Sequence, residues 1–509
     1  MRLLRYGAIL AVCLVSTASA QTNTFYDTLR YPQTYSFDFK GDGARAAGMG
    51  NAFMAVSDDI SAGSWNPAGL YSAELVTFGM SLMNFQPGGS GWGNMNVFST
   101  SDSDRSNFDI SDGFTGDVQL VRVIAPLRIK GHPFVFSFGN NRTFEDYQQV
   151  KFFSTQDQLF LWQIGPKLYT DTNRIDLSIA SSTFTKMNCV NIAFGTRLQG
   201  NLSGGISLNV YGGRSFRNER QTAFIDSLRL PTGALTYQFT DFARDVTHND
   251  TTRFSGYNVT IGLKKTFERW AIASVIKTPF TMSAKLDSVT YTISSTVNEY
   301  GQQFPQDNGT DTIMVPRSLT KYDIPMSTTL GVSFKPNENT LIAADIEARS
   351  WEGKKVKVRI DEELIPGSDS KEKFIEKDPH WQNVFTFRLG GEKTFETGIG
   401  KVPVRLGFGS VGIPAPNAAL GVIVDTVNLT IEPVVSYSST RMTTVSFGFG
   451  LHWSQIHLDW AFVRSSYKHA MFRDLGSDLS LDRSMIIGFG NVETDNTSNS
   501  IMFSFTGVF

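Results

Sequence analysis

The stretch VSFGFGLHWSQIHLDWAF, residues 445–462, decides the fold class. Its first half places Val445, Phe447, Phe449, Leu451 and Trp453 at every second position, with small or polar residues between them. Its second half places Ile456, Leu458, Trp460 and Phe462 on one face and His457, Asp459 and Ala461 on the other. A period of two is the repeat of a strand whose faces meet different surroundings. The two halves therefore predict a hairpin with a very short turn.

The same alternation recurs along the chain, at 134–138, 257–263, 330–334, 385–389 and 402–408. A soluble sandwich also alternates, but its polar faces usually carry Lys and Glu, whereas these carry mainly Gly and Ser. Small polar faces suit a wet or plugged lumen. We therefore predict an all-β, transmembrane antiparallel barrel of about 14 strands. The long polar segments 86–115, 215–252, 285–322, 352–381 and 465–482 are expected to be its outer loops.

Composition supports this class. The chain has 509 residues, a net charge of −2, 45 Gly and 40 Phe, so it lacks both the basic excess of a nucleic-acid binder and a helical composition. Two uncharged stretches, 75–101 and 406–424, are long enough for a membrane helix, but each contains several Gly and Pro residues. Strands and turns are the better interpretation of both.

The two ends of the chain carry export features. Residues 1–20 place Arg2 and Arg5 before a short apolar run and end in Ala18-Ser19-Ala20, which predicts a cleaved signal peptide. Cys189 is then the only cysteine of the mature chain, which excludes disulfides and Cys-rich metal sites. At the other end, Ile501, Phe503, Phe505, Gly507 and Phe509 alternate to the last residue. This strand resembles the sorting strand that barrel-assembly machinery recognises, although Gly507 departs from the usual aromatic or apolar residue.

Residues 41–70 lack the alternation and predict short helices and turns. Asn66 before Pro67 is expected to cap a helix with proline at its first position. Ser57 or Asp58 is expected to accept the N–H groups of another helix, and Gly48 and Gly50 allow close packing or positive φ. We expect 21–72 to fold into the lumen as a plug and 73–509 to form the barrel.

A set of residues in this segment resembles the N-terminal signature of the FadL/TodX outer-membrane transport family, especially its PorV-like branch. The set comprises Arg45, Gly48-Met49-Gly50, Ala52-Phe53, Asp58-Asp59 and Trp65-Asn66-Pro67-Ala68-Gly69-Leu70. The resemblance implies a 14-stranded barrel with an N-terminal hatch, integral in the outer membrane of a Gram-negative-type bacterium. It also implies passive transport of hydrophobic molecules such as long-chain fatty acids. PorV-like members instead serve as protein-binding components of a secretion system, and that alternative stays open.

A second group of polar residues is predicted in the lumen. His452, His457 and Asp459 fall on the lumen faces of adjacent strands, where they suit a hydrogen-bond network bracing the plug better than a catalytic or metal cluster. Asp58 and Asp59 could act as a gate, although capping explains at least one of them. We expect no enzyme activity, metal, cofactor or nucleic-acid partner. The expected partners are hydrophobic small molecules, outer-membrane lipids, barrel-assembly machinery and, in the alternative, secretion-system proteins.

Overall fold

The computed structural model describes residues 41–94, 105–110, 115–130, 132–164, 167–226, 229–232, 235–238, 241–299, 302–311, 319–360, 373–425, 430–473 and 490–509. The predicted signal peptide and the first part of the predicted plug, 21–40, lie outside these residues. The short helices are α2 (Ala44–Gly48), α3 (Ala62–Trp65) and the 3-10 helix η1 (Pro67–Ser72).

The strands of the first half are β1 (Thr77–Asn94), β2 (Arg105–Ile110), β3 (Thr115–Ile129), β4 (His132–Ile164), β5 (Lys167–Gln199), β6 (Leu202–Asp226), β7 (Arg229–Thr232), β8 (Leu235–Gln238), β9 (Asp241–Thr266), β10 (Trp270–Lys277) and β11 (Phe280–Glu299). Those of the second half are β12 (Gln302–Asp311), β13 (Leu319–Ile324), β14 (Ser327–Asn337), β15 (Thr340–Arg349), β16 (Val356–Ile360), β17 (Lys373–Lys377), β18 (Val384–Thr397), β19 (Gly400–Asp425), β20 (Thr430–His452), β21 (Ile456–Arg473) and β22 (Gly490–Val508).

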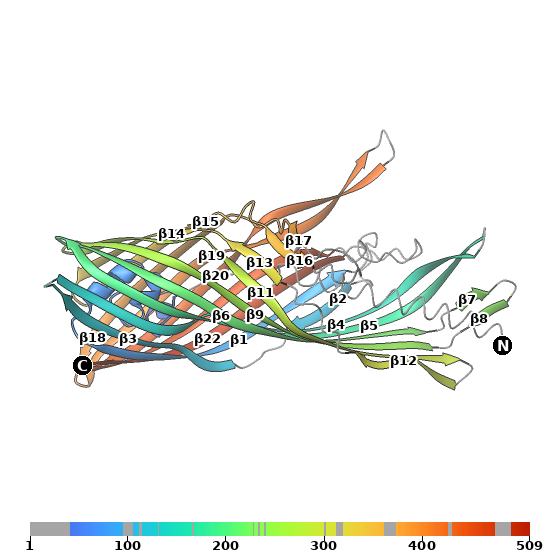
Figure 1. The fold of residues 1–509 in the computed structure, drawn as a ribbon, viewed down its shortest axis with the longest axis horizontal. Coiled ribbons are helices and arrows are strands. Elements are labelled where there is room, and N and C mark those ends of the chain that lie inside the picture. Colours follow the sequence, from blue (N-terminus) through green and yellow to red (C-terminus); the bar gives the residue numbers. More distant parts are fainter. Residues whose placement is uncertain are drawn as a thin grey trace.

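Apart from β7 and β8, which pair only with each other, these segments form a closed antiparallel barrel of 14 strands, as predicted (Figure 1). The wall closes where the last strand, β22, pairs with β1 from Thr77↔Val508 to Asn94↔Asn491. Ile501, Phe503, Phe505 and Gly507 lie in this closing strand, and Phe509 follows it. The predicted hairpin is formed by β20 and β21, with only residues 453–455 between them.

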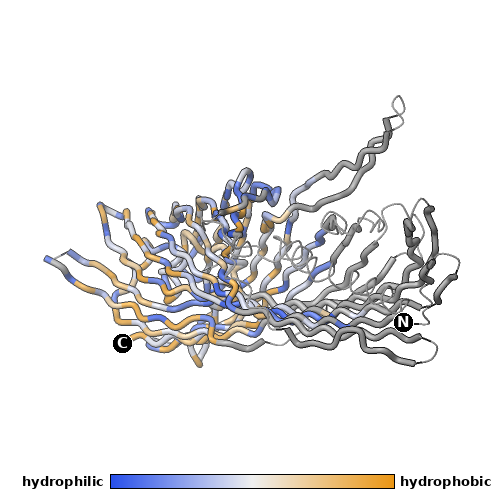
Figure 2. The backbone as a smooth tube through the Cα atoms, turned by 45° about the vertical axis from the view of Figure 1, so that its right-hand side comes forward, coloured by the Kyte–Doolittle hydropathy of each residue, from blue (hydrophilic) through white to orange (hydrophobic). Residues whose placement is uncertain are grey.

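Hydropathy alternates along the described strands near the short turns (Figure 2). Val445, Phe447 and Phe449 of β20 are exposed on the outside, whereas Ser446 and Thr444 face inward and are buried. The outer side chains of the other strands are likewise apolar, and Trp270, Trp453 and Phe509 stand beside the short turns. A continuous apolar outer band with aromatic residues at its edge is typical of a barrel surrounded by lipid. Among the described residues, no helix has the length and apolarity needed to cross a membrane.

The polar segments predicted as loops are in large part strand, which corrects that prediction. β4 and β5 each have 33 residues and run far beyond the alternating region. β6 and β9 stay paired through 215–226 and 241–252, and β21 continues through 465–473. The hydropathy pattern did not reveal these extensions, because a strand with water on both faces keeps its backbone pairing without needing an apolar side.

The wall is interrupted at one level across four neighbouring positions. Residues outside the strands separate β10 from β11 at 278–279, β13 from β14 at 325–326, β15 from β16 at 350–355 and β17 from β18 at 378–383. Single backbone bonds remain there, from Thr278 N to Val259 O and from Gln382 N to Pro414 O. On the side of the interruption near the short turns, β10, β14, β15 and β18 pair in that order. On the other side, β11, β13, β16 and β17 pair in that order. By contrast, β3 and β4 pair without a shift from Leu120↔Asn141 to Ile129↔His132.

Candidate functional site: the plug and the lumen beyond it

The plug lies inside the barrel near the short turns, where the helices of 44–72 appear in blue among the strands (Figure 1). Glycines of the wall allow it to pack against bare backbone. A Cβ at Gly205 would lie 2.3 Å from the Pro67 carbonyl carbon, and one at Gly390 would lie 2.3 Å from the Met49 oxygen. Gly50 itself has φ 64°, and Gly48 approaches the Cα of Gly448. The close packing predicted for Gly48 and the positive φ predicted for Gly50 are both present.

The Asn-Pro-Ala turn stands at the centre of the plug. Asn66 caps η1, with Pro67 at the first helical position: its Oδ1 accepts from Ala68 N at 3.0 Å and its Nδ2 donates to Met54 O at 3.0 Å. Trp65 is buried and donates from Nε1 to Asp42 O at 2.9 Å. Gly69 and Leu70 are buried in the same turn. The predicted cap is therefore present, and it also ties two parts of the plug together.

The caps predicted at Ser57 and Asp58 are wrong. Ser57 Oγ donates to Phe53 O at 2.6 Å, and Asp58 is bonded to Arg45 instead of a helix terminus. Asp59 is the residue that accepts local donors, from Ser61 N at 2.8 Å and Ser61 Oγ at 2.6 Å. Burial raises the pKa of Asp59. At Asp58 burial also acts to raise the pKa, but the charges of Arg45 and Lys264 and the hydrogen bond from Arg45 together outweigh it and hold the pKa below the usual value.

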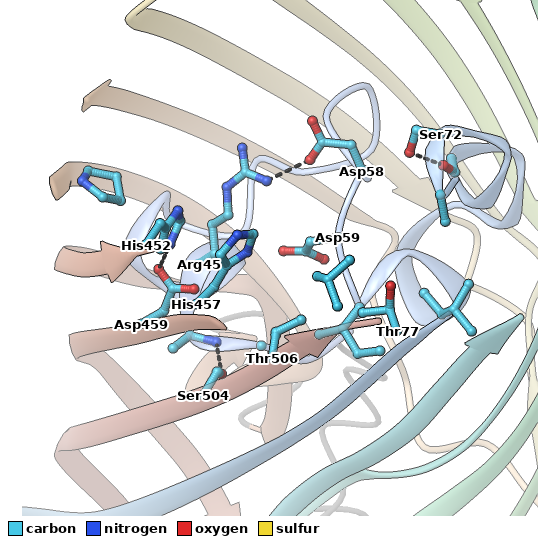
Figure 3. A pocket seen from close by; sticks show the side chains of 18 of the residues that line it. Arg45, Asp58, Asp59, Ser72, Thr77, His452, His457, Asp459, Ser504 and Thr506 are labelled. Carbon is cyan, nitrogen blue, oxygen red and sulfur yellow. Dashed lines mark hydrogen bonds and ion pairs between the residues drawn. The ribbon is translucent and has the colours of Figure 1, made fainter. Parts of the chain in front are cut away.

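A chain of charged side chains joins the plug to the wall, and Figure 3 shows its first pair, Arg45 with Asp58. Arg45 Nη1 lies 2.6 Å from Asp58 Oδ1, and its Nε lies 2.9 Å from Glu392 Oε2 on β18. Glu392 also accepts from Arg405 Nε at 2.6 Å, and Arg405 Nη1 lies 2.6 Å from Asp459 Oδ1. These contacts fix α2 to β18, β19 and β21, because each charge has an opposite partner within hydrogen-bond distance.

The predicted histidine group lies at the far end of this chain. His452 Nε2 is 2.9 Å from Asp459 Oδ1, and the rings of His452 and His457 stack at 4.4 Å. With Arg45, Asp58 and Asp59 they border a cavity of about 410 Å³ between plug and wall. No group of His, Cys, Asp and Glu within the described ranges is arranged to hold a metal ion. The geometry is that of a network bracing the plug.

Beyond the plug, toward the long strand ends, an apolar cluster occupies the lumen; we call it the lumen cluster. Its members are Met187, Cys189, Tyr211, Phe254, Met282, Ala284, Tyr322, Ile324, Trp351, Val356, Trp381 and Val384. Trp351 and Trp381 come from the interrupted parts of the wall, and their rings meet edge to face at 4.9 Å. Both indole Nε1 atoms are buried without a hydrogen-bond partner among the described residues.

Charged side chains adjoin the lumen cluster on its plug side. Glu347 accepts from Arg349 Nε at 2.7 Å, from Arg388 Nη2 at 2.8 Å and from Ser327 Oγ at 2.9 Å. Arg349 pairs in register with Val384, a member of the cluster. Sequence reasoning missed Trp381, because 352–381 was interpreted as an outer loop, and it singled out none of the charged residues of this group. A tryptophan within so polar a segment was the one local signal that could have revealed it.

Comparison with solved structures identifies the fold. A Pseudomonas aeruginosa FadL homologue matches with a TM-score of 0.53 and 12% identity, over 93% of this chain and 99% of that chain. The Pseudomonas putida toluene transporter TodX matches with a TM-score of 0.50 and 12% identity, over 93% and 99% of the two chains. This chain has the FadL/TodX barrel fold. No family model matches the sequence, and no curated protein sequence does. The FadL/TodX-type fold implied by the N-terminal residues is thus confirmed, and the PorV-like branch stays a prediction.

Proposed function

We propose that this chain is an integral outer-membrane protein of a Gram-negative-type bacterium that carries hydrophobic compounds through its plugged lumen by passive diffusion. The observation that carries the proposal is the lumen cluster, an apolar surface placed between the plug and the long strand ends. Hydrophobic molecules gain free energy when such a surface removes them from water. The names of the two matching structures, a FadL homologue and a toluene transporter, support the same class of cargo.

The polar groups around the cluster suit cargo with one polar end, such as a long-chain fatty acid. Trp351 and Trp381 offer buried indole N–H donors, and Arg349 and Arg388 lie on the plug side. An apolar site with a few placed polar groups binds and orients an amphipathic ligand. A carboxylate accepts hydrogen bonds from indole and guanidinium donors, while the tail contacts Met282, Ile324 and their neighbours.

The proposed exit for cargo is sideways, through the wall beside the cluster. The wall is interrupted at 278–279, 325–326, 350–355 and 378–383, at the level from which Trp351 and Trp381 enter the lumen. Fewer backbone hydrogen bonds join the strands there, so separating them costs less than elsewhere in the wall. A hydrophobic molecule that leaves through the wall enters lipid and avoids water.

The secretion alternative is less well supported. A protein-binding scaffold needs no apolar lumen, and a polar, sealed interior would favour it. Ion pairs brace the plug in this barrel, but the lumen cluster adds twelve mostly apolar side chains for which a scaffold has no use. We therefore place transport first.

The first experiment is mass spectrometry of lipids bound to purified mature protein in a detergent that resembles no natural ligand. We expect stoichiometric fatty acids or similar molecules. Ala284→Trp, which fills the lumen cluster, should remove them, whereas Ala344→Trp, on the outer face of β15, should not. An empty barrel that retains protein partners would overturn transport in favour of the secretion alternative.

The double variant Trp351→Phe with Trp381→Phe tests the polar end of the cargo, since it keeps the rings and removes both N–H donors. We expect fatty-acid affinity to fall about thirtyfold, from two hydrogen bonds of roughly 1 kcal/mol each. Binding of toluene, which has no acceptor, should be unchanged. An equal loss for both ligands would contradict a role in head-group binding.

A further inference from the structure

Direct polar contacts hold the plug to β9, to β15 and, through α2, to the strands β18 to β22. Asp345 of β15 accepts from Phe53 N at 2.7 Å and from Met54 N at 3.0 Å, and Lys264 of β9 donates to Val56 O. Ala44 N donates to Ser504 Oγ of β22 at 2.9 Å, and Gly50 N donates to Ser446 Oγ of β20 at 2.9 Å. Ser446 Oγ in turn donates to Gly48 O at 3.1 Å. Together with the ion pairs of Arg45, these bonds attach α2 to the wall formed by β18 to β22.

The side of the plug that faces β3 to β6 meets a buried polar patch whose side chains make few hydrogen bonds. Arg122 of β3 is 1% exposed, and its Nη1 reaches only Ile60 O at 3.5 Å and Ser61 O at 3.3 Å. Its Nε and Nη2 have no partner in the described part of the chain. The same holds for four acceptor atoms and hydroxyls on the neighbouring strands: Ser137 Oγ, Asn141 Oδ1, Asn191 Oδ1 and Ser207 Oγ.

These residues form one continuous surface beneath α3. Strand register places Arg122 opposite Gly139, Gly139 opposite Asn191, and Ser137 opposite Ala193, which is opposite Ser207. Gly63 of α3 seals the surface, since a Cβ there would lie 2.8 Å from Arg122 Nη1 and 2.9 Å from Asn191 Oδ1.

The two sides therefore respond differently to water. A buried polar atom without a partner carries its full desolvation penalty, and a buried cation carries more. Separating α3 from the patch lets water satisfy these atoms. That gain offsets part of the cost of parting Ile60, Ala62 and Leu70 from the apolar residues of β3, β4 and β5. Separating α2 from its wall breaks ion pairs and hydrogen bonds that are already made.

We infer that the plug opens by releasing its α3 edge from β3 to β6 while α2 stays attached to β18 to β22. The path past the plug then runs along Arg122, Ser137 and Asn191. The purpose of the movement, letting cargo pass, rests on the proposed function, but the movement itself is independent of it.

Two engineered cross-links in a Cys189→Ala background test the inference. Gly63→Cys with Ser137→Cys locks the α3 edge, since a Cβ at Gly63 would lie 3.2 Å from Ser137 Oγ. Ala44→Cys with Ser504→Cys locks the α2 edge, which is already bonded. The readouts are single-channel conductance and hydrogen exchange of backbone amides in 60–66. We expect the oxidised 63–137 cross-link to slow hydrogen exchange and to reduce the frequency of channel openings, each at least tenfold, with recovery on reduction. The oxidised 44–504 cross-link should change the exchange rate and the opening frequency by less than twofold. The reverse ranking, or equal effects, would overturn the inference.

Arg122→Met provides a second test that does not depend on a cross-link. If the poorly paired guanidinium of Arg122 destabilises the contact between α3 and the wall, an apolar side chain of similar length should slow hydrogen exchange in 60–66 severalfold. Faster exchange would show that Arg122 anchors the plug and would refute the inference. Uptake measured on the same variants separates the two proposals: changes in exchange without any uptake would contradict transport and leave the opening mechanism in place.

Discussion

Arg45 of the plug and Glu392 of β18 form a two-point ion pair, with Nε to Oε2 at 2.9 Å and Nη2 to Oε1 at 3.0 Å. The paired geometry matches the planar fork of a guanidinium to a carboxylate, which gives direction as well as attraction. Because Glu392 is also bonded to Arg405, the wall side of the contact is held in place by a second ion pair. The plug is thus held by a prepared site in the barrel.

Arg45→Gln should loosen the plug. Removing the guanidinium of a largely buried pair takes away a positive charge that neutralises Glu392 and Asp58. The expected loss of plug stability is about 3 kcal/mol. We expect faster hydrogen exchange in 44–54 and larger or more frequent conductance openings. Arg220→Gln is the matched control, because Arg220 pairs with Asp245 on an exposed surface. Equal behaviour of the two variants would show that the Arg45 pair does not hold the plug.

Gly50→Ala should destabilise the plug more than Gly200→Ala. Both glycines have positive φ, 64° and 55°, so both substitutions carry a backbone cost of roughly 1 kcal/mol. Only at Gly50 does the added Cβ collide with the wall, 2.6 Å from Phe408 N, whereas nothing lies within 4 Å at Gly200. Protease sensitivity of the plug is the measurement. Similar sensitivity in both variants would mean that the plug does not need this close approach.

Asn66→Ala combined with Pro67→Ala should also loosen the plug. The change removes the cap on Ala68 N and the bond to Met54 O, at about 1–2 kcal/mol for the cap alone. We expect a rise in single-channel conductance or in its opening frequency. Ser72→Ala, which loses only a bond within η1 to Gly69 O, is the control. Unchanged conductance in the double variant would refute the assignment of this turn as a plug anchor.

The hold on the plug should weaken as the pH rises from 5 to 7. Burial raises the pKa of Asp42 from 3.8 to about 6, an effect that the charge of Arg122 only partly offsets. The seated plug binds this proton more tightly than a released plug does, so stability is greatest at low pH and falls as the pH approaches 6. The expected loss between pH 5 and 7 is about 1 kcal/mol.

Exchange of 42–66 as a function of pH is the measurement, with Asp42→Asn expected to flatten it. Asparagine still accepts from Ser64 Oγ through Oδ1, as Asp42 does at 3.0 Å. Asp58→Asn should lower stability but leave the slope intact, since the pKa of Asp58 lies below its usual value. A slope that persists in Asp42→Asn would assign the pH dependence to another group.

Local sequence signals were sufficient wherever the interacting residues are near neighbours. The period of two in 445–462 predicted the β20–β21 hairpin, and Asn66-Pro67 predicted the capped turn, because each signal depends on residues only a few positions apart. The alternation also indicated which faces meet lipid and which meet the lumen. It failed in the polar extensions of β4, β5, β6 and β9. Both faces carry polar residues there, so hydropathy does not alternate along the sequence.

Only the tertiary structure decided which distant residues meet. Arg45 was visible as part of a motif, but its partner Glu392 lies 347 positions away and belongs to no motif. The register of the closed wall likewise sets Trp351 against Trp381 and Arg122 beneath α3. In a barrel, the pairing of every strand fixes the height of its side chains relative to all the others, and no local pattern carries that information.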